Sequence, residues 1–277
     1  MRALHENKPD HRSRLDCAAQ RAPACPRRRG VGLCGTPRRA ARVGAGPAQQ
    51  RSPNRQLEAS HARLRVASER DPLTDLANRR HFHAVMQASQ RANGPGFIGA
   101  LLMVDIDHFK RINDGHGHAA GDLVLVEVAR RLNDAVRGDD LVVRWGGEEF
   151  LIVAMKLTTE QTDQLAARVL ASIGETPVRA EGELLRITAS IGYARFPLPP
   201  YGVPVPWEQA INLADMALYT AKSQGRNRAV GVVSALAADA LTLRRIEADF
   251  DQGWREGRVT LLQTAGPVPS PPGRGLG

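Results

Sequence analysis

One run of residues, 97–106, constrains the fold of this chain more than any other feature. It reads Phe-Ile-Gly-Ala-Leu-Leu-Met-Val-Asp-Ile, so only Asp105, near its end, is charged. A strand with one face in water alternates apolar and polar residues, whereas a continuous apolar run of strand length is typical of a strand buried on both faces. The chain therefore needs helices on both sides of a central sheet.

The rest of the folded region alternates strand-like and helix-like segments. A Gly-Gly pair at 146–147 separates two strand-like runs, as in a tight β-hairpin. Strands are predicted at residues 97–106, 141–145, 149–154, 184–194 and 229–233, and helices at 82–90, 123–136, 158–173 and 207–224. The predicted fold class is α/β, an α+β sandwich with a mixed five-stranded central sheet flanked by helices in the order β-α-α-β-β-α-β-α-β.

Charge is divided unevenly along the chain. The formal net charge is +9, but residues 1–70 hold 16 Lys and Arg against 5 Asp and Glu. The remaining residues hold 22 basic and 24 acidic side chains, so the basic excess lies in the N-terminal tail. High basicity therefore does not indicate a nucleic-acid groove in the folded part, and we expect no nucleic-acid partner.

Composition divides the chain into four predicted regions. They are a disordered basic tail at 1–52, a signalling or dimerisation helix at 53–70, a folded domain at 71–231, and a C-terminal helix with a disordered tail at 232–277. The basic tail could be an arm that contacts a membrane or nucleic acid, or a segment without function. We favour the second reading because only charge supports the first.

Cysteine usage and hydropathy bear on the compartment. The three cysteines, Cys17, Cys25 and Cys34, lie in the tail at spacings that fit neither a zinc knuckle nor a disulfide framework. No apolar run approaches the roughly 18 residues that a membrane span needs, and the N-terminus lacks the apolar segment of a secretory signal. We therefore expect a cytoplasmic protein without a membrane span.

Carboxylates gather where predicted strands end. Asp105 and Asp107 close the buried run, and Glu148 and Glu149 follow the Gly-Gly turn. If the hairpin pairs beside the buried strand, Glu148 falls next to Asp105. Ordinary solvated acids would explain either pair alone. Both pairs together, beside glycines that let a phosphate chain approach the backbone, favour a divalent-metal site for phosphoryl transfer.

The segment around the turn, Arg144-Trp-Gly-Gly-Glu-Glu-Phe150, resembles the signature of the GGDEF family of diguanylate cyclases in its GGEEF form. Further segments resemble the family's motifs in the expected order: Asp71-Pro-Leu-Thr-Asp-Leu-Ala-Asn-Arg-Arg80, Asp105-Ile-Asp-His-Phe-Lys-Arg-Ile-Asn113, Gly117-His118, Gly121-Asp122, Ala189-Ser-Ile-Gly-Tyr193, Ala214-Asp-Met-Ala-Leu-Tyr219 and Lys222-Ser-Gln-Gly-Arg-Asn227. The resemblance implies a palm-like nucleotidyl-cyclase fold. It also implies an enzyme that condenses two GTP into cyclic di-GMP and two pyrophosphate.

The resemblance also implies roles for individual residues. Asp105, Glu148 and Glu149 would be catalytic and, with the Ile106 carbonyl, would hold two Mg²⁺ or Mn²⁺ ions. Which glutamate acts as the base stays open. Asn113 and Asp122 would bind guanine, whose N–H groups a carboxylate accepts well. The other substrate-binding residues, which would shape the pocket, approach the phosphates or neutralise them, are Phe109, Lys110, His118, Gly146, Gly147, Lys222 and Arg226.

Two further expectations follow from the resemblance. Each domain would present one GTP, so catalysis would need a homodimer, and the helix at 53–70 is the natural place to control its geometry. Arg137-Gly-Asp-Asp140 resembles the family's R-x-x-D motif, at which cyclic di-GMP would inhibit the enzyme. Such a pair could also be an ordinary turn salt bridge. Arg168 is a candidate for a second arginine of this site.

Other functions fit parts of the sequence. A catalytically silent GGDEF domain, which binds GTP or cyclic di-GMP and signals through contacts, is the main alternative, although Asp105, Glu148 and Glu149 are all present. A cyclase that makes a cyclic mononucleotide conflicts with the guanine pair and the Gly-Gly-Glu-Glu turn. A nucleic-acid binder rests only on the tail. Residues 241–254 faintly resemble the start of a cyclic di-GMP phosphodiesterase domain, but we expect no such activity from so short a segment.

Overall fold

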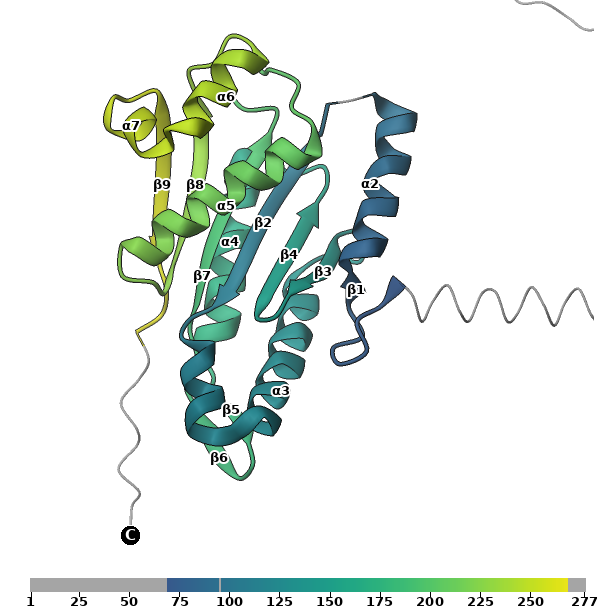
Figure 1. The fold of residues 1–277 in the computed structure, drawn as a ribbon, viewed down its shortest axis with the longest axis vertical. Helices are drawn as coiled ribbons and strands as arrows, with labels where there is room; N and C mark the ends of the chain where they lie inside the picture. Colours follow the sequence, from purple (N-terminus) through teal and green to yellow (C-terminus); the bar gives the residue numbers. More distant parts are fainter. Residues whose placement is uncertain (1–68, 95, 269–277) are drawn as a thin grey trace, which may run out of the picture. The chain divides into compact units, whose positions relative to one another are not determined.

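The computed structural model describes residues 69–94 and 96–268, and Figure 1 shows their fold. Its centre is a seven-stranded mixed sheet. In their order across the sheet the strands are β1 (Ala77–Asn78), β3 (Leu141–Gly146), β4 (Glu149–Ala154), β2 (Gly99–Ile106), β7 (Ala189–Phe196), β8 (Arg228–Ala235) and β9 (Val259–Ala265). Neighbouring strands are antiparallel, except that β1 pairs with β3, and β7 with β8, in parallel.

Helices cover both faces of this sheet. Helices α2 (Arg79–Asn93) and α5 (Trp207–Ser223) pack on one face, and α3 (Phe109–Ala135) and α4 (Thr159–Gly174) on the other (Figure 1). Every residue of β2 is buried. Because successive side chains of a strand point to opposite faces, Leu102 belongs to the core under α3 and α4, and Leu101 to the core under α2 and α5. The predictions of an α/β fold and of a strand buried on both faces are confirmed.

A bend in α3 places part of the site. Gly117 interrupts the helix with a φ of +82°, a conformation that glycine adopts without a steric penalty. Across the bend, Gly121 lies so close to Asn113 that a Cβ at residue 121 would overlap the Asn113 side chain. With α3 counted as two segments, the elements β2, α3, β3, β4, α4, β7, α5 and β8 follow the predicted order of the central fold.

The sheet differs from the prediction in its number of strands. We predicted five strands, and β1 and β9 at the two edges make it seven. The predicted strand at 184–194 is also divided, because only β7 joins the central sheet. Residues just before it form β6 (Glu183–Leu185), which pairs with β5 (Val178–Ala180) in a separate two-stranded sheet. A long apolar run cannot by itself show where a strand leaves one sheet for another.

The region after residue 231 continues the same architecture. Strand β8 runs past the predicted boundary to Ala235, and β9 pairs with it in antiparallel fashion. The single helix expected here is two helices, α6 (Ala240–Ala248) and α7 (Phe250–Arg255). Asp249 separates them with non-helical backbone angles and caps α7 by accepting a hydrogen bond from the Gln252 amide. The tail predicted at 1–52 and most of the helix predicted at 53–70 lie outside the described residues.

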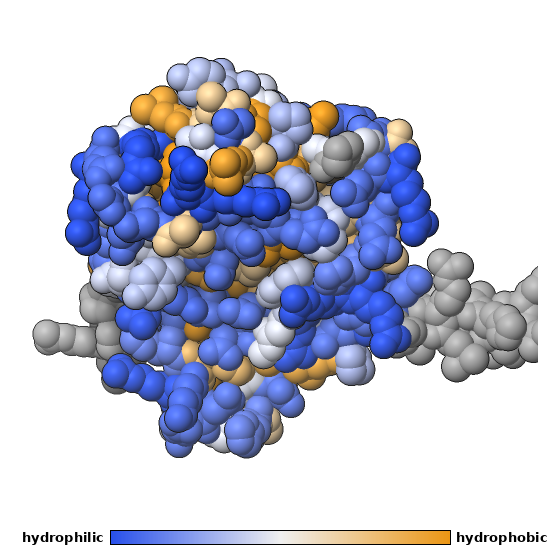
Figure 2. All heavy atoms as spheres, turned by 45° about the horizontal axis from the view of Figure 1, so that its top comes forward, coloured by the Kyte–Doolittle hydropathy of each residue, from blue (hydrophilic) through white to orange (hydrophobic). Residues whose placement is uncertain are grey.

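The surface seen in Figure 2 is mainly hydrophilic, with apolar side chains gathered toward the top of the view. Large exposed apolar residues include Ile98, Leu236 and Leu241. Within residues 69–94 and 96–268, no helix combines the length and the apolar character that crossing a membrane requires.

Candidate active site

The predicted carboxylates meet at one end of the sheet. Asp105, near the end of β2, is directly opposite Glu149 on β4 and Ser190 on β7. Its side chain lies on the face covered by α2 and α5, because Leu101 and Met103 of the same alternation belong to that core. We expected Glu148 to fall next to Asp105, but the register gives that place to Glu149. Glu148 precedes it in the turn, where its carbonyl accepts a 3.4 Å hydrogen bond from the Ile106 amide.

Asp105 carries a charge that its surroundings do not match. Its side chain is 9% exposed, and the Lys222 Nζ lies 2.7 Å from its Oδ2. Burial raises the pKa of Asp105 above its usual value, and repulsion from Glu148 and Asp107 adds to the rise, while Lys222 opposes it. One lysine therefore faces several carboxylates.

The negative charge of Glu149 is also poorly balanced by its surroundings. Burial raises the pKa of Glu149, and repulsion from Asp105, Asp215 and Glu148 raises it further, again opposed by Lys222. Excess negative charge on oxygen donors suits Mg²⁺, which takes one or two carboxylates and fills its other positions with water and phosphate oxygens. The described residues contain no group of three or more His, Cys, Asp or Glu arranged to hold a metal alone. The carboxylates present thus fit an ion whose remaining ligands would be water and phosphate oxygens.

Asp107, two residues further on, is bound quite differently. Its Oδ1 accepts a 2.7 Å hydrogen bond from the Ser190 hydroxyl. Its Oδ2 accepts bonds of 2.7 Å from the Thr188 hydroxyl and 3.0 Å from the Asn227 amide. Both oxygens are therefore occupied by neutral donors. Asp107 fastens the ends of β2 and β7 to the loop after α5 and leaves the role of reactive carboxylate to its neighbours.

The Gly-Gly turn is held from outside by an arginine. The Arg144 guanidinium donates to the Gly147 carbonyl through Nε at 3.3 Å and Nη2 at 3.0 Å. Its Nη1 donates to Asp71 Oδ1 at 2.9 Å. Burial alone would raise the pKa of Asp71, but hydrogen bonds from Thr74 and Arg144 keep it below its usual value. Sequence reasoning placed both residues in motifs and gave neither a role, since their contact spans 73 positions.

The residues predicted to bind the base lie around the bend of α3. Phe109 is buried and approaches Gly121, as does Asn113. His118, Lys110 and Asp122 are exposed, and Gly146 and Gly147 form the exposed hairpin turn. The structure thus groups Phe109 and Asn113 directly and leaves the charged members of this set open to solvent.

The predicted phosphate-binding cations Lys222 and Arg226 lie at the end of α5 and in the loop that follows it. Lys222 lies in the last turn of α5, and its ammonium reaches Asp105. Arg226 is half-buried, and its backbone turns with a φ of +62°. The amide of the next residue, Asn227, is the donor to Asp107, so the loop that contains Arg226 is anchored beside the acidic residues.

The residues of the predicted product site form a closed turn after α3. The Arg137 amide donates to Asp140 Oδ2 at 3.0 Å, and the Asp140 amide donates to the Arg137 carbonyl at 3.0 Å. The Arg137 side chain is exposed. Arg168, the candidate second arginine, donates from Nε to the Ala135 carbonyl at the end of α3.

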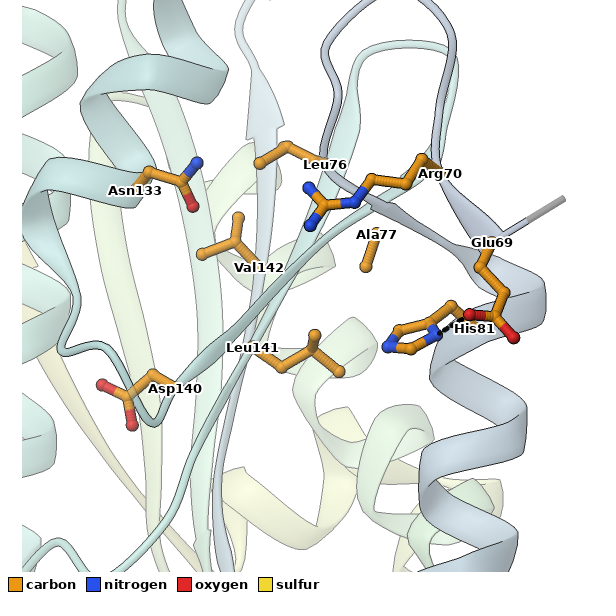
Figure 3. Close-up of a pocket in the computed structure, with 9 residues that line it drawn as sticks. All are labelled: Glu69, Arg70, Leu76, Ala77, His81, Asn133, Asp140, Leu141 and Val142. Carbon is orange, nitrogen blue, oxygen red and sulfur yellow. Dashed lines mark ion pairs between the residues drawn. The ribbon is translucent and has the colours of Figure 1, made fainter. Parts of the chain in front are cut away.

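A pocket of about 340 Å³ lies beside this turn (Figure 3). Asp140 and Asn133 are on one side of it, and Arg70, Glu69 and His81 are on the other, with an ion pair of 3.4 Å between His81 and Glu69. Leu76, Ala77, Leu141 and Val142 complete the lining. The end of the predicted signalling helix and the R-x-x-D turn therefore share one cavity.

The chain is similar to known proteins over the region that contains these residues. Residues 68–228 match the family model described as "Diguanylate cyclase, GGDEF domain". Diguanylate cyclase DosC of Escherichia coli K12 is 39% identical over 160 residues, 57% of this chain and 34% of that protein. Cyclic di-GMP phosphodiesterase NbdA of Pseudomonas aeruginosa is 32% identical over 209 residues, 74% of this chain and 26% of that protein. The chain thus spans about a third or less of these two relatives.

The fold is also similar to a solved structure. The coiled coil and GGDEF domain of DgcB from Caulobacter crescentus, in complex with c-di-GMP, superposes with a TM-score of 0.59 at 26% identity, over 66% of this chain and 96% of that one. The family match covers more than half of the residues and includes the turn with Glu148 and Glu149, the bend of α3, and Lys222 at the end of α5. This chain belongs to the family of the diguanylate cyclase GGDEF domain.

Proposed function

We propose that this protein is a diguanylate cyclase that condenses two GTP into cyclic di-GMP and releases two pyrophosphate. The observation that carries the proposal is the pairing of Asp105 and Glu149 across β2 and β4, beside a glycine turn and facing Lys222. The relative DosC is named a diguanylate cyclase, and the similar DgcB structure contains c-di-GMP.

Asp105, Glu148, Glu149 and the Ile106 carbonyl would hold two Mg²⁺ or Mn²⁺ ions. Bound there, the ions would neutralise phosphate charge and favour the deprotonated 3′-hydroxyl. The fit rests on the raised pKa values of Asp105 and Glu149, both caused first by burial and then by crowding with other carboxylates. A site with that excess of negative charge is stabilised when a cation binds.

The protein side chains would orient the nucleotide. Asn113 and Asp122 would bind the guanine edge, with Phe109 and His118 shaping its surroundings. Gly146 and Gly147 leave the turn without side chains where the phosphates would lie, and Lys110, Lys222 and Arg226 would neutralise them.

In the proposed reaction the 3′-oxygen of one GTP attacks the α-phosphorus of the other and pyrophosphate leaves. Glu149 or Glu148 would accept the 3′-hydroxyl proton, and the raised pKa of Glu149, caused first by its burial, brings that carboxylate closer to the operating pH of a base. One domain offers one GTP, so two domains must face each other in a homodimer, whose geometry would supply much of the rate.

We further propose product inhibition at Arg137 and Asp140. The turn already fixes Asp140 by a hydrogen bond from the Arg137 amide, while the Arg137 guanidinium is free to reach a phosphate or guanine. Arg137→Ala should relieve inhibition by added cyclic di-GMP, whereas Arg111→Ala, an exposed arginine of α3, should not. An unchanged inhibition curve in Arg137→Ala would contradict the proposal that cyclic di-GMP inhibits at this site.

A catalytically silent domain that binds GTP or cyclic di-GMP is the second candidate. One observation favours keeping it: NbdA, which is 32% identical to this chain over 209 residues, is named a phosphodiesterase, so similarity over this region does not by itself establish cyclase activity.

A product assay separates the two. Purified protein with GTP and Mg²⁺ or Mn²⁺ should yield cyclic di-GMP by liquid chromatography. Glu149→Ala should abolish synthesis, and Glu160→Ala, which alters an exposed glutamate of α4, should retain it. Full synthesis by Glu149→Ala would contradict the site, and GTP binding without any product would favour the silent domain.

A further inference from the structure

We propose that Lys222 is a built-in counter-ion of Asp105 that a divalent cation must displace, and that the triphosphate promotes metal binding by accepting the displaced ammonium. Metal and nucleotide would then bind cooperatively through a side chain of the protein. The inference rests on the proposed function, because it takes Asp105 as a metal ligand.

The position of Lys222 is the first support. Its Nζ lies 2.7 Å from Asp105 Oδ2, at the mouth of the acidic end, with 31% of the side chain exposed against 9% for Asp105. The lysine sits in the last turn of α5, which packs on the same sheet face as Asp105. Its stem is therefore fixed by the helix, while its ammonium is at the boundary with solvent and can swing outward.

The difference between two nearby carboxylates is the second support. Both oxygens of Asp107 accept hydrogen bonds from neutral groups at the start of β7 and in the loop after α5, so a cation that took this carboxylate would break contacts that join these elements. Asp105 is matched instead by a flexible side chain. Lysine has a compact charge on a four-carbon stem, which makes it an exchangeable partner.

The charge balance is the third support. Lys222 is the only cation among the main electrostatic influences on Asp105 and Glu149, within the described part of the chain. A divalent ion on Asp105 would lie within a few ångströms of the ammonium and repel it, so the two compete for one carboxylate. An ammonium released from Asp105 needs a new anionic partner, and a bound triphosphate supplies one.

Competition of this kind has a measurable consequence in the absence of nucleotide. Removing the charge of Lys222 should raise the affinity for Mn²⁺ alone by about 5- to 150-fold, the usual range of coupling between sites. Because the triphosphate accepts the displaced ammonium only in the wild type, a non-hydrolysable GTP analogue should strengthen Mn²⁺ binding less when the charge of Lys222 is removed.

The test is a titration of the full chain with Mn²⁺ and no nucleotide, in which the free ion is measured by electron paramagnetic resonance. Lys222→Met, which keeps the stem, should bind Mn²⁺ more tightly than the wild type, and Lys222→Arg should not. Equal or weaker binding by Lys222→Met, or equal tightening by Lys222→Arg, would overturn the proposal. If Lys222→Met does not fold, Lys222→Gln is judged by the same titration.

A double variant shows where the ion binds. Asp105→Asn combined with Lys222→Met should lose the gained affinity, and retained tight binding would place the ion elsewhere and overturn the proposal. The result is independent of turnover. Protein that shows this competition but makes no cyclic di-GMP would contradict the proposed function and leave the role of Lys222 standing.

Discussion

Asp105 and Arg131 are buried to the same degree, each with 6% of its surface exposed, but their surroundings are opposite. Arg131, on α3, pairs with Glu127 at 2.9 Å. It also donates to four carbonyls at and beyond the end of α4, those of Ser172, Ile173, Thr176 and Pro177, at 2.6 to 3.4 Å. Asp105 has a single lysine and is crowded by other acids.

The difference separates a structural charge from a functional one. A buried charge whose hydrogen-bonding capacity is filled locks two elements together, here α3 and α4. A buried charge that is repelled by its neighbours weakens the fold unless something binds to it. Burial of a charge alone therefore does not locate the active site. A buried charge that its neighbours do not neutralise does.

The largest expected effect is on the structural side of this comparison. Arg131→Ala should destabilise the protein by about 3–5 kcal/mol, because it leaves Glu127 without a buried partner and several carbonyls without a donor. Arg130→Ala, at the neighbouring exposed position that also contacts Glu127, is the matched control and should cost far less. Urea denaturation followed by circular dichroism compares them, and equal losses would mean that burial of Arg131 is irrelevant.

The next effect concerns the arginine that holds the turn. Arg144→Lys keeps a charge but cannot span Asp71 and the Gly147 carbonyl with one planar group. We expect kcat to fall by about 10- to 100-fold, or about 1.4–2.7 kcal/mol in the barrier, with little change in KM, because the turn is misplaced while the base pocket is intact. Steady-state kinetics with Arg91→Lys, an exposed arginine in the last turn of α2, as the control tests this, and wild-type kcat in Arg144→Lys would refute a positioning role.

The sequence predicted the central elements because their signals are local. The apolar run of β2 and the Gly-Gly pair between β3 and β4 mark strands without reference to distant residues. The register was less accessible: Glu149, not Glu148, faces Asp105, because β4 pairs with β2 without a break from Ala154 to Glu149, and no local signal sets that register. A shift of one residue exchanges which side chain faces the core.

Other parts of the site depend on contacts between distant segments. Two ion pairs, Lys222 with Asp105 and Arg144 with Asp71, form only when the chain has folded. The sequence around each residue does not indicate which residue it will pair with. Arg131 lies in an ordinary helical pattern. Its burial results from packing against the end of α4, which the pattern does not show. Strand β9 was missed because its pairing with β8 follows two intervening helices.

A smaller effect is expected on the functional side. Asp105→Asn should leave stability unchanged or raise it by about 0–1 kcal/mol without metal, because it removes a repelled charge while Lys222 can turn to water. Asp107→Asn should instead destabilise, since an amide cannot accept all the donors that its carboxylate does. Thermal unfolding of both variants decides the point, and a greater loss for Asp105→Asn would reverse the comparison.

The smallest effect is on pH dependence. Hydrogen bonds from Arg130, and then from Arg131, lower the pKa of Glu127 to about 2. A depressed folded-state pKa gives stability that is present above the unfolded value of 4.5 and is lost as the pH falls toward about 2. Glu127→Gln should therefore flatten the stability curve between these values. If Glu127→Gln lost stability below pH 4.5 as steeply as the wild type, the Glu127 carboxylate would not contribute to this loss.

The most direct test of the central claim is the nucleotide product formed from GTP by the wild type and by Asp105→Asn, each with Mn²⁺ and each first shown to be folded. We predict cyclic di-GMP from the wild type and a loss of at least about 1000-fold in Asp105→Asn at undiminished stability. Cyclic di-GMP made at the wild-type rate by Asp105→Asn would contradict it.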